Sequence, residues 1–539
     1  MFRILSRVPN RSRRNGDTFS LSDESPDIES TSDPDFGTPL VTEPVAETTP
    51  LLRRVIHGSA WMLGLRVALR SVRFVRNIIL ARILAPDDLG LFAMALLVLS
   101  VIERFSNTGV TQALVQRRHA IEEYLDTAWT VLIIRSVGLA AILLVVAQPI
   151  AEFFQEPGVA PLIRALACTV LIRGVKNPGV ICLQRQLDFR RQFMLRFGGT
   201  FVELLVSVPA AIVMRSAWAL MIGLIVGSMA SLLFSYHVHP YRPRLQLNFH
   251  QVWDLTPFGV WIFLDDMLFF LAYRGDSLIV GKLLGSAALG AYVLAYGMGD
   301  AITTEFGRVI TEVAFPAYSR MQDHLVRVRK ALCMSLEMAS CVAAPAAVLL
   351  YFGAEAITSV VLGERWLAVA TVLPPLALAG AARSVLVNMA AAFKGVGQPS
   401  HAFRLNLIGV AVTYCMVYPL VMRMGLAGVG WAVFAGVVAM LPFAAYSGRQ
   451  LLQLSMSDLT YSLLPGGALA LLVSVPLALF HRYYESGDVV ALLVLLAMTG
   501  TLFAAGVVLL WTRFRRGPLQ IRALMAKSRR RTAEAASAV

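Results

Sequence analysis

Arginine is the residue type with the clearest chemical potential in this chain, because it recurs inside a stretch that is otherwise apolar. The segment 65–82 reads LRVALRSVRFVRNIILAR, and its five arginines are Arg66, Arg70, Arg73, Arg76 and Arg82. At about 100° per residue in an α-helix, Arg66, Arg70 and Arg73 fall on one face, and Asn77 extends that face by one turn. A guanidinium group at the centre of a membrane helix costs roughly 2.5–3.5 kcal/mol, so we expect this face to meet a cavity or a partner.

The chemistry open to this arginine face is anion binding or ion pairing. A guanidinium group donates two parallel hydrogen bonds to the oxygens of a phosphate. Arg66 and Arg73 are about 10 Å apart along a helix axis, which is comparable with a diphosphate and its first sugar. The face therefore predicts a site for an anionic substrate, and a salt bridge or gate between two halves of the protein is the alternative.

Further charged residues fall near the middle of other apolar segments. The cations that we predict to line the same cavity are Arg135, Arg173 and Arg383, although bonding between helices is the alternative for the first two. The carboxylates that we predict to couple or gate transport are Glu103, Asp265, Asp266, Asp300 and Glu305. Intramembrane charges of this kind mark substrate or ion pathways by default.

The composition indicates the environment of these charges. The chain has 539 residues, of which 57% are hydrophobic and 15% charged, and this balance is typical of a polytopic membrane protein. Windows of about 20 apolar residues predict fourteen membrane helices and an all-α fold. The net charge of +14 lies mostly in alternate loops, which predicts cytoplasmic termini and argues against nucleic-acid binding.

An internal repeat predicts how these helices are grouped. At an offset of 200 residues, Leu89 and Gly90 match Leu289 and Gly290, Arg82 matches Lys282, and Arg66 matches Asp266. Parallel repeats are a transporter architecture with the substrate between the halves, so we expect Arg66 and Asp266 to confront each other there. The predicted parts are a disordered cytoplasmic tail 1–52, six-helix bundles 53–245 and 246–450, helices 13 and 14 in 451–512, and a basic cytoplasmic tail 513–539.

Four stretches resemble a known family. They are NIILARILAPDDLGLFAMAL (77–96), VICLQRQLDFRRQF (180–193), DSLIVGKLLGSAALGAYVLAY (276–296) and FPAYSRMQDHLVRVRKAL (315–332). They are similar to the polysaccharide-transporter branch, of the Wzx type, in the multidrug/oligosaccharidyl-lipid/polysaccharide (MOP) exporter superfamily. The resemblance implies two pseudo-symmetric six-helix bundles, two extra C-terminal helices and a cation-lined cavity. It also implies alternating access for an oligosaccharide linked to undecaprenyl diphosphate, in the bacterial inner membrane among membrane lipids.

Alternatives to this function remain open at the level of sequence. One is a drug/cation antiporter or a lipid II flippase on the same fold, and another is a membrane polysaccharide polymerase or ligase. The absence of a GxxxxGK[ST] motif argues against ATP hydrolysis, and the five cysteines form no metal-binding pattern. We therefore expect a protein that is not an enzyme and has no cofactor or metal. Coupling to H⁺ or Na⁺, and partners such as a polymerase and a chain-length regulator, are further expectations.

Overall fold

The computed structural model describes residues 68–106, 122–185, 189–248, 259–483 and 489–513. The chain divides into two units, Met1–Val55 and Ile56–Val539, and the first of these lies outside the described residues. Within the described ranges every regular element is a helix, which confirms the all-α prediction.

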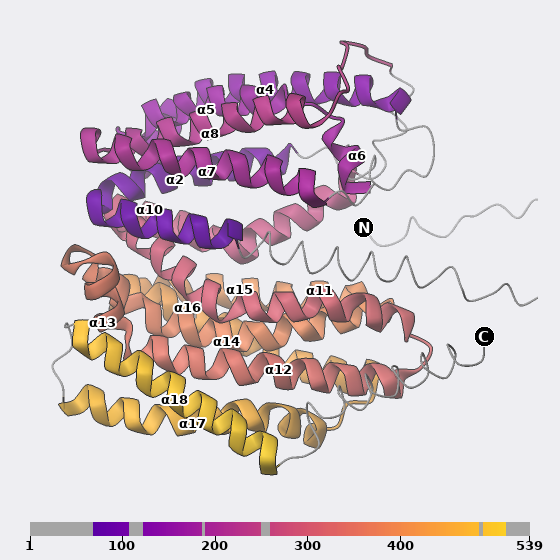
Figure 1. Ribbon diagram of the computed structural model, residues 1–539, viewed down its shortest axis with the longest axis vertical. Helices are drawn as coiled ribbons and strands as arrows, with labels where there is room; N and C mark the ends of the chain where they lie inside the picture. The colour runs from indigo at the N-terminus through magenta and orange to yellow at the C-terminus, as the bar shows by residue number, and fades with distance from the viewer. Residues whose placement is uncertain (1–67, 107–121, 186–188, 249–258, 484–488, 514–539) are drawn as a thin grey trace, which may run out of the picture. The chain divides into compact units, whose positions relative to one another are not determined.

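The N-terminal helices are drawn in indigo to magenta in Figure 1. Residues 68–83 are helical and contain the described part of the arginine face. The helices that follow are α2 (Pro86–Phe105), α4 (Glu122–Phe154), α5 (Val159–Gly174), α6 (Val180–Arg185), α7 (Phe189–Met214) and α8 (Ala217–Val238).

The C-terminal helices follow in red to yellow. They are α10 (Gly259–Ile302), α11 (Thr304–Arg320), α12 (Leu325–Phe352), α13 (Ala354–Ile357), the π-helix Thr358–Leu362, the 3-10 helix Glu364–Trp366, α14 (Leu367–Gly395), α15 (Pro399–Met424) and α16 (Leu426–Leu452). The chain ends with α17 (Met456–Tyr483) and α18 (Val489–Arg513).

These helices have the properties of membrane spans. Nine of the described helical segments are long and apolar enough to cross a bilayer. Large apolar side chains point outward from them, and Val145 and Val213 are 75% and 84% exposed. Such exposure suits hydrocarbon rather than water, so the chain is a polytopic membrane protein. Each of the fourteen predicted windows overlaps a helix, but the count of fourteen spans stays a prediction.

Two predicted spans meet within one long helical element. The sequence predicts separate spans near 254–280 and 287–313, and α10 (Gly259–Ile302) consists of two helices with a kink between these two windows. The two helical parts join at Gly285, whose φ of 82° is unfavourable for a residue with a Cβ atom. The second part then ends before Thr303, whose hydroxyl donates to the carbonyl of Gly299 at 2.6 Å. A kink at Gly285 therefore separates the two helices in the interval where hydropathy predicts a break between spans.

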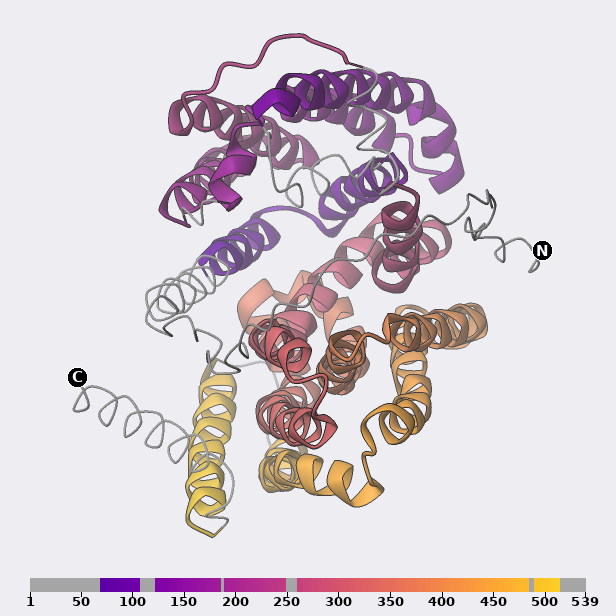
Figure 2. The same ribbon diagram turned by 90° about the vertical axis from the view of Figure 1, so that its right-hand side faces the viewer.

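The repeated glycines lie where α2 crosses the second part of α10. A Cβ atom on Gly90 would be 1.8 Å from the carbonyl oxygen of Ser286, and one on Gly290 would be 2.6 Å from that of Pro86. Only glycine permits this approach of two helix backbones. The two copies of the sequence repeat therefore contact each other at these glycines. Figure 2 shows the same helices turned by 90° about the vertical axis of Figure 1.

Candidate functional site

The arginine face lines a cavity. Helix 68–83 contributes Arg70, Arg73 and Asn77, α7 contributes Arg196, and the second part of α10 supplies an apolar wall, around a volume of about 330 Å³. Arg73 is exposed, and Arg70 and Asn77 are partly buried. Three guanidinium groups thus surround one space, which we call the central cavity. This arrangement suits a multiply charged anion, because each group can donate to separate oxygens.

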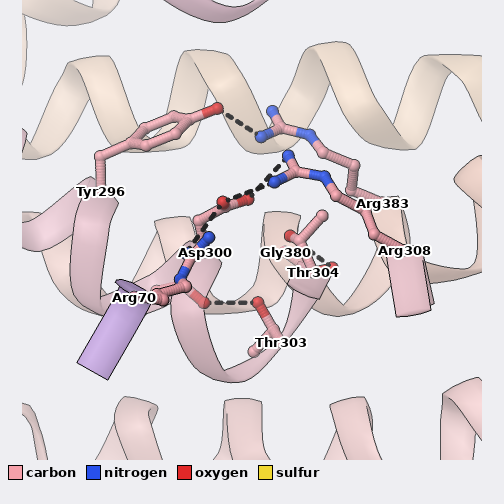
Figure 3. A network of polar contacts seen from close by, with 9 residues as sticks. Arg70, Tyr296, Asp300, Thr303, Thr304, Arg308, Gly380 and Arg383 are labelled. Carbon is pink, nitrogen blue, oxygen red and sulfur yellow. Dashed lines mark hydrogen bonds and ion pairs between the residues drawn. The ribbon is translucent and has the colours of Figure 1, made fainter. Parts of the chain in front are cut away.

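A carboxylate from the other half of the chain contacts this arginine face (Figure 3). Asp300, near the end of α10, accepts a hydrogen bond from Nη2 of Arg70 at 3.3 Å. It also accepts two from Arg308 of α11, at 3.1 and 3.3 Å. The side chain of Asp300 is only 12% exposed, and that of Arg70 is 35% exposed. Asp300 is therefore held within its own bundle by Arg308 while it reaches across to Arg70.

Arg383 lies next to this network on α14. Its Nη1 donates to the hydroxyl of Tyr296 at 2.6 Å, and its guanidinium group lies 5.7 Å from the centre of the tyrosine ring. The residue is 9% exposed, and it lines a cavity of about 430 Å³ inside the C-terminal bundle. Arg383 does not line the central cavity.

The other predicted cations lie elsewhere in the N-terminal bundle. Arg135 of α4 and Arg173 of α5 line a separate cavity of about 470 Å³, together with Glu103 and Arg104 of α2. Nη1 of Arg173 lies 3.2 Å from the Glu103 carboxylate. The predicted set of cavity cations is therefore divided among three cavities rather than gathered in one.

Two arginines of the opening segment stand apart from the central cavity. Arg76 forms an ion pair with Glu203 of α7. Arg82 donates to the backbone carbonyls of Val360 and, at 2.9 Å, Val361. Both acceptors belong to the π-helix Thr358–Leu362, so Arg82 binds backbone of the C-terminal bundle.

Some predicted residues cannot be placed at side-chain level. Arg66 lies outside the described residues. Asp265 and Asp266 belong to α10 and Glu305 to α11, but their side chains also lie outside the described part. The predicted confrontation of Arg66 with Asp266 therefore stays a prediction.

The sequence reasoning missed several polar residues of the bundles. Arg196 lines the central cavity, and Arg308 is the second partner of Asp300. Asp276 is 5% exposed on α10 and accepts a hydrogen bond from the Tyr292 hydroxyl at 2.5 Å. The signal for Asp276 was present, since it is a carboxylate near the end of an apolar window. Arg196 gave a weaker signal, because it resembles the ordinary basic residues at a span end.

Contacts between the two bundles also occur at the end of helix 68–83. Nε1 of Trp366 donates to the carbonyl of Ala81 at 2.7 Å, and both residues are fully buried. Lys282, the repeat equivalent of Arg82, donates to the carbonyl of Phe153 at the end of α4. Arg82 and Lys282 thus each bind backbone carbonyls of the opposite bundle. We call this set of contacts, made by Ala81, Arg82, Phe153, Lys282 and Trp366, the Trp366 clasp.

The fold and the cavity together define a class of protein. Long apolar helices in two bundles, with an arginine-lined cavity that an opposing carboxylate reaches, are the arrangement of a polytopic membrane transporter. The chain belongs to the family of polysaccharide biosynthesis proteins, whose model matches residues 79–371, more than half of the chain.

Relatives in sequence support the same placement. The chain is 24% identical to the lipopolysaccharide biosynthesis protein WzxC of Escherichia coli, over 62% of this chain and 68% of the relative. It is 25% identical to the succinoglycan biosynthesis transport protein ExoT of Rhizobium meliloti, over 68% of this chain and 74% of the relative. It is also 24% identical to the teichuronic acid biosynthesis protein TuaB of Bacillus subtilis, over 63% and 70%.

Solved structures are similar in fold. The lipid II flippase MurJ in an inward closed conformation superposes with a TM-score of 0.68 at 10% identity, covering 84% of this chain and all of MurJ. An inward-facing multidrug resistance transporter of the MATE family, in the MOP superfamily, gives 0.53 at 17% identity, covering 70% of this chain and 94% of the transporter. The family model confirms the predicted polysaccharide family, and these solved structures show that the fold is shared with flippases and transporters of other substrates.

Proposed function

We propose that this protein is a flippase that moves oligosaccharide units linked to undecaprenyl diphosphate across the bacterial inner membrane. The moved units are precursors of an extracellular polysaccharide. Both termini face the cytoplasm in this proposal, in agreement with the basic residues in alternate loops. The chain is a transporter rather than an enzyme in this proposal, in agreement with the relative that is named a transport protein.

The central cavity is the observation that carries this proposal. Arg70, Arg73 and Arg196 offer guanidinium groups to the diphosphate, which is the one group common to all such lipid-linked substrates. Charge-assisted bonds to phosphate oxygens are about twice as strong as neutral hydrogen bonds. A cavity that holds the diphosphate leaves the sugar composition free to vary, as polysaccharide export requires.

Asp300 gives this cavity a means of responding to its substrate. Arg70 is bonded to the Asp300 carboxylate at 3.3 Å, so a diphosphate competes with Asp300 for the same guanidinium group. Binding would then weaken a contact between the bundles and lower the cost of changing their relative arrangement. This competition for Arg70 couples substrate binding to the relative movement of the two bundles.

In an alternating-access cycle, the Trp366 clasp is the set of contacts that keeps one side of the protein closed. It joins the bundles at the end that becomes periplasmic if the termini are cytoplasmic. Its bonds run to backbone carbonyls, so their strength does not depend on the substrate. A cycle in which the Asp300 contact and the clasp break in turn exposes the cavity to one side and then the other.

The fold alone also fits a lipid II flippase, because MurJ shares it. The substrates differ in their sugars, whereas the diphosphate is common to both. The family and the relatives named for lipopolysaccharide, succinoglycan and teichuronic acid favour a polysaccharide precursor.

Export by cells provides the test. Arg70→Gln and Arg73→Gln are each expected to lower polysaccharide export at least about tenfold, because each removes a charge-assisted bond worth about 1.5–3 kcal/mol. Arg164→Gln removes an exposed guanidinium group from α5 and is the matched control. Protein levels in the membrane are compared by immunoblot. Export at the normal level by both cavity variants would contradict the proposal.

A further inference from the structure

The second cationic cavity lies entirely within the N-terminal bundle. It is lined by residues of α2, α4 and α5, has a volume of about 470 Å³, and shares no lining residue with the central cavity. Helices α4 and α5 pack closely beside this cavity, because a Cβ atom on Gly174 would be 2.2 Å from the Ser136 hydroxyl oxygen. We call it the α2–α4–α5 cavity.

Its charged lining is dominated by arginine. Arg104, Arg135 and Arg173 face the cavity together with one carboxylate, that of Glu103. Three guanidinium groups and one carboxylate give this cavity a net positive charge, which raises the local concentration of anions. A site of this charge attracts anions with more than one negative charge.

Arg135 has a positioning role in this cavity. Its Nη2 donates to the carbonyl of Glu103 at 2.8 Å and to the Ser106 hydroxyl at 3.0 Å. Both acceptors belong to the C-terminal end of α2, where a cation also meets the negative end of the helix dipole. Arg135 therefore fixes the turn of α2 that carries Glu103 and Arg104.

Glu103 has the properties of a displaceable counter-ion. Its side chain is 36% exposed and that of Arg173 is 38% exposed, although they lie 3.2 Å apart. Ion pairs with this degree of exposure contribute only about 0–1 kcal/mol. A diphosphate carries more charge than a carboxylate and offers oxygens to two guanidinium groups at once, so it would replace Glu103 beside Arg173.

We propose that the α2–α4–α5 cavity is a second anion site, which binds a diphosphate group to Arg104 and Arg173 in exchange for the Glu103 carboxylate. In the transport cycle this group is the diphosphate of the lipid-linked substrate before it enters the central cavity. That identity rests on the proposed function, whereas the presence of an anion site does not.

Lys176 links the two cavities electrostatically. It lies in the connection between α5 and α6, beyond the last residue of α5. Its side chain is partly buried, and its positive charge interacts with those of Arg173 and Arg196. Arg173 lines the α2–α4–α5 cavity and Arg196 lines the central cavity, so Lys176 lies between cations of both. A diphosphate leaving one site would remain near positive charge on its way to the other.

Equilibrium binding to the full-length protein in nanodiscs of zwitterionic lipid tests this inference. The probes are inorganic pyrophosphate and farnesyl diphosphate, titrated separately. The unmodified protein is expected to show two sites. Arg104→Gln with Arg173→Gln is expected to abolish one site, and Arg70→Gln with Arg73→Gln the other. Arg164→Gln, on the same helix as Arg173, is the control for the loss of one charge from α5.

Glu103→Gln provides the sharper arm of the test. It removes the competing carboxylate, so the affinity of the α2–α4–α5 site for pyrophosphate is expected to rise about three- to tenfold. A gain in affinity does not arise from misfolding. Binding of both probes assigns the site to the diphosphate group itself, and binding of farnesyl diphosphate alone assigns it to lipid-linked diphosphates.

Two results would overturn the inference. One is a single site that is unchanged in the Arg104 and Arg173 variant and lost in the Arg70 and Arg73 variant, which would leave the proposed function standing. The other is an unchanged or lower affinity in Glu103→Gln. A single site that is lost only in the Arg104 and Arg173 variant would instead count against the central cavity and support the second site.

Discussion

Removing the carboxylate of Asp300 is expected to weaken the contact between the two bundles. Asp300→Asn keeps the shape of the side chain and removes its charge, so Arg70 loses an ion-pair partner 3.3 Å away. Two unit charges at this distance attract each other by about 1 kcal/mol in water and by about 5 kcal/mol at an effective dielectric constant of 20. Because Arg70 is 35% exposed, we expect a net coupling of roughly 1–2 kcal/mol.

This coupling changes a population that can be measured. A change of 1–2 kcal/mol shifts an equilibrium roughly 5- to 30-fold, here towards the arrangement in which the Arg70 contact is broken. Spin labels at Met194→Cys on α7 and Val326→Cys on α12 report the separation of the bundles, because both positions are exposed. The labelled background lacks the five natural cysteines.

A double-mutant cycle separates the contact from other effects of the substitution. Arg70→Gln, Asp300→Asn and the double variant are expected to give similar shifts, since each removes the same bond. Arg308→Gln removes the other partner of Asp300, which lies on α11 of the same bundle, and serves as the matched control. A coupling energy between Arg70 and Asp300 below about 0.3 kcal/mol would refute the reasoning.

Two further predictions concern the crossing helices and the Trp366 clasp. Gly90→Ala places a Cβ atom 1.8 Å from the carbonyl oxygen of Ser286, so thermal unfolding in detergent is expected to show a large loss of stability. Gly138→Ala is the control and is expected to be tolerated, because its Cβ atom would meet no heavy atom of a neighbouring element within 4 Å. Trp366→Phe removes the donor to the buried carbonyl of Ala81, at a cost of about 1–3 kcal/mol. The rate of hydrogen exchange at residues 78–84 is therefore expected to rise, and an unchanged rate would argue against the clasp.

The sequence was most informative where its pattern is local. The spacing of Arg70, Arg73 and Asn77 predicts a shared helix face, and the structure places all three on one cavity. The Leu-Gly pairs at 90 and 290 predict a repeat, and both glycines lie at the crossing of α2 with α10. In each case the helical period or the small size of glycine carries the information.

Contacts between distant segments were harder to predict. The repeat matches Arg66 with Asp266 but does not give the angle at which the helices cross, so the pairing of Arg70 with Asp300 was not foreseen. Arg82 and Trp366 bind backbone carbonyls, and a carbonyl acceptor leaves no trace in the sequence. Gly285 was not distinguishable from other loop glycines until its backbone conformation was known.

Transport by the purified protein in liposomes tests the central claim most directly. A fluorescent oligosaccharide linked to undecaprenyl diphosphate is placed in both leaflets, an impermeant reductant destroys the label at the outer face irreversibly, and the loss of the protected inner fraction is followed over time. We expect the unmodified protein to bring the inner fraction to the outer face and the Arg70→Gln, Arg73→Gln double variant to do so at least about tenfold more slowly. Equal rates in both proteins, or no transport of this substrate by the unmodified protein, would contradict the account.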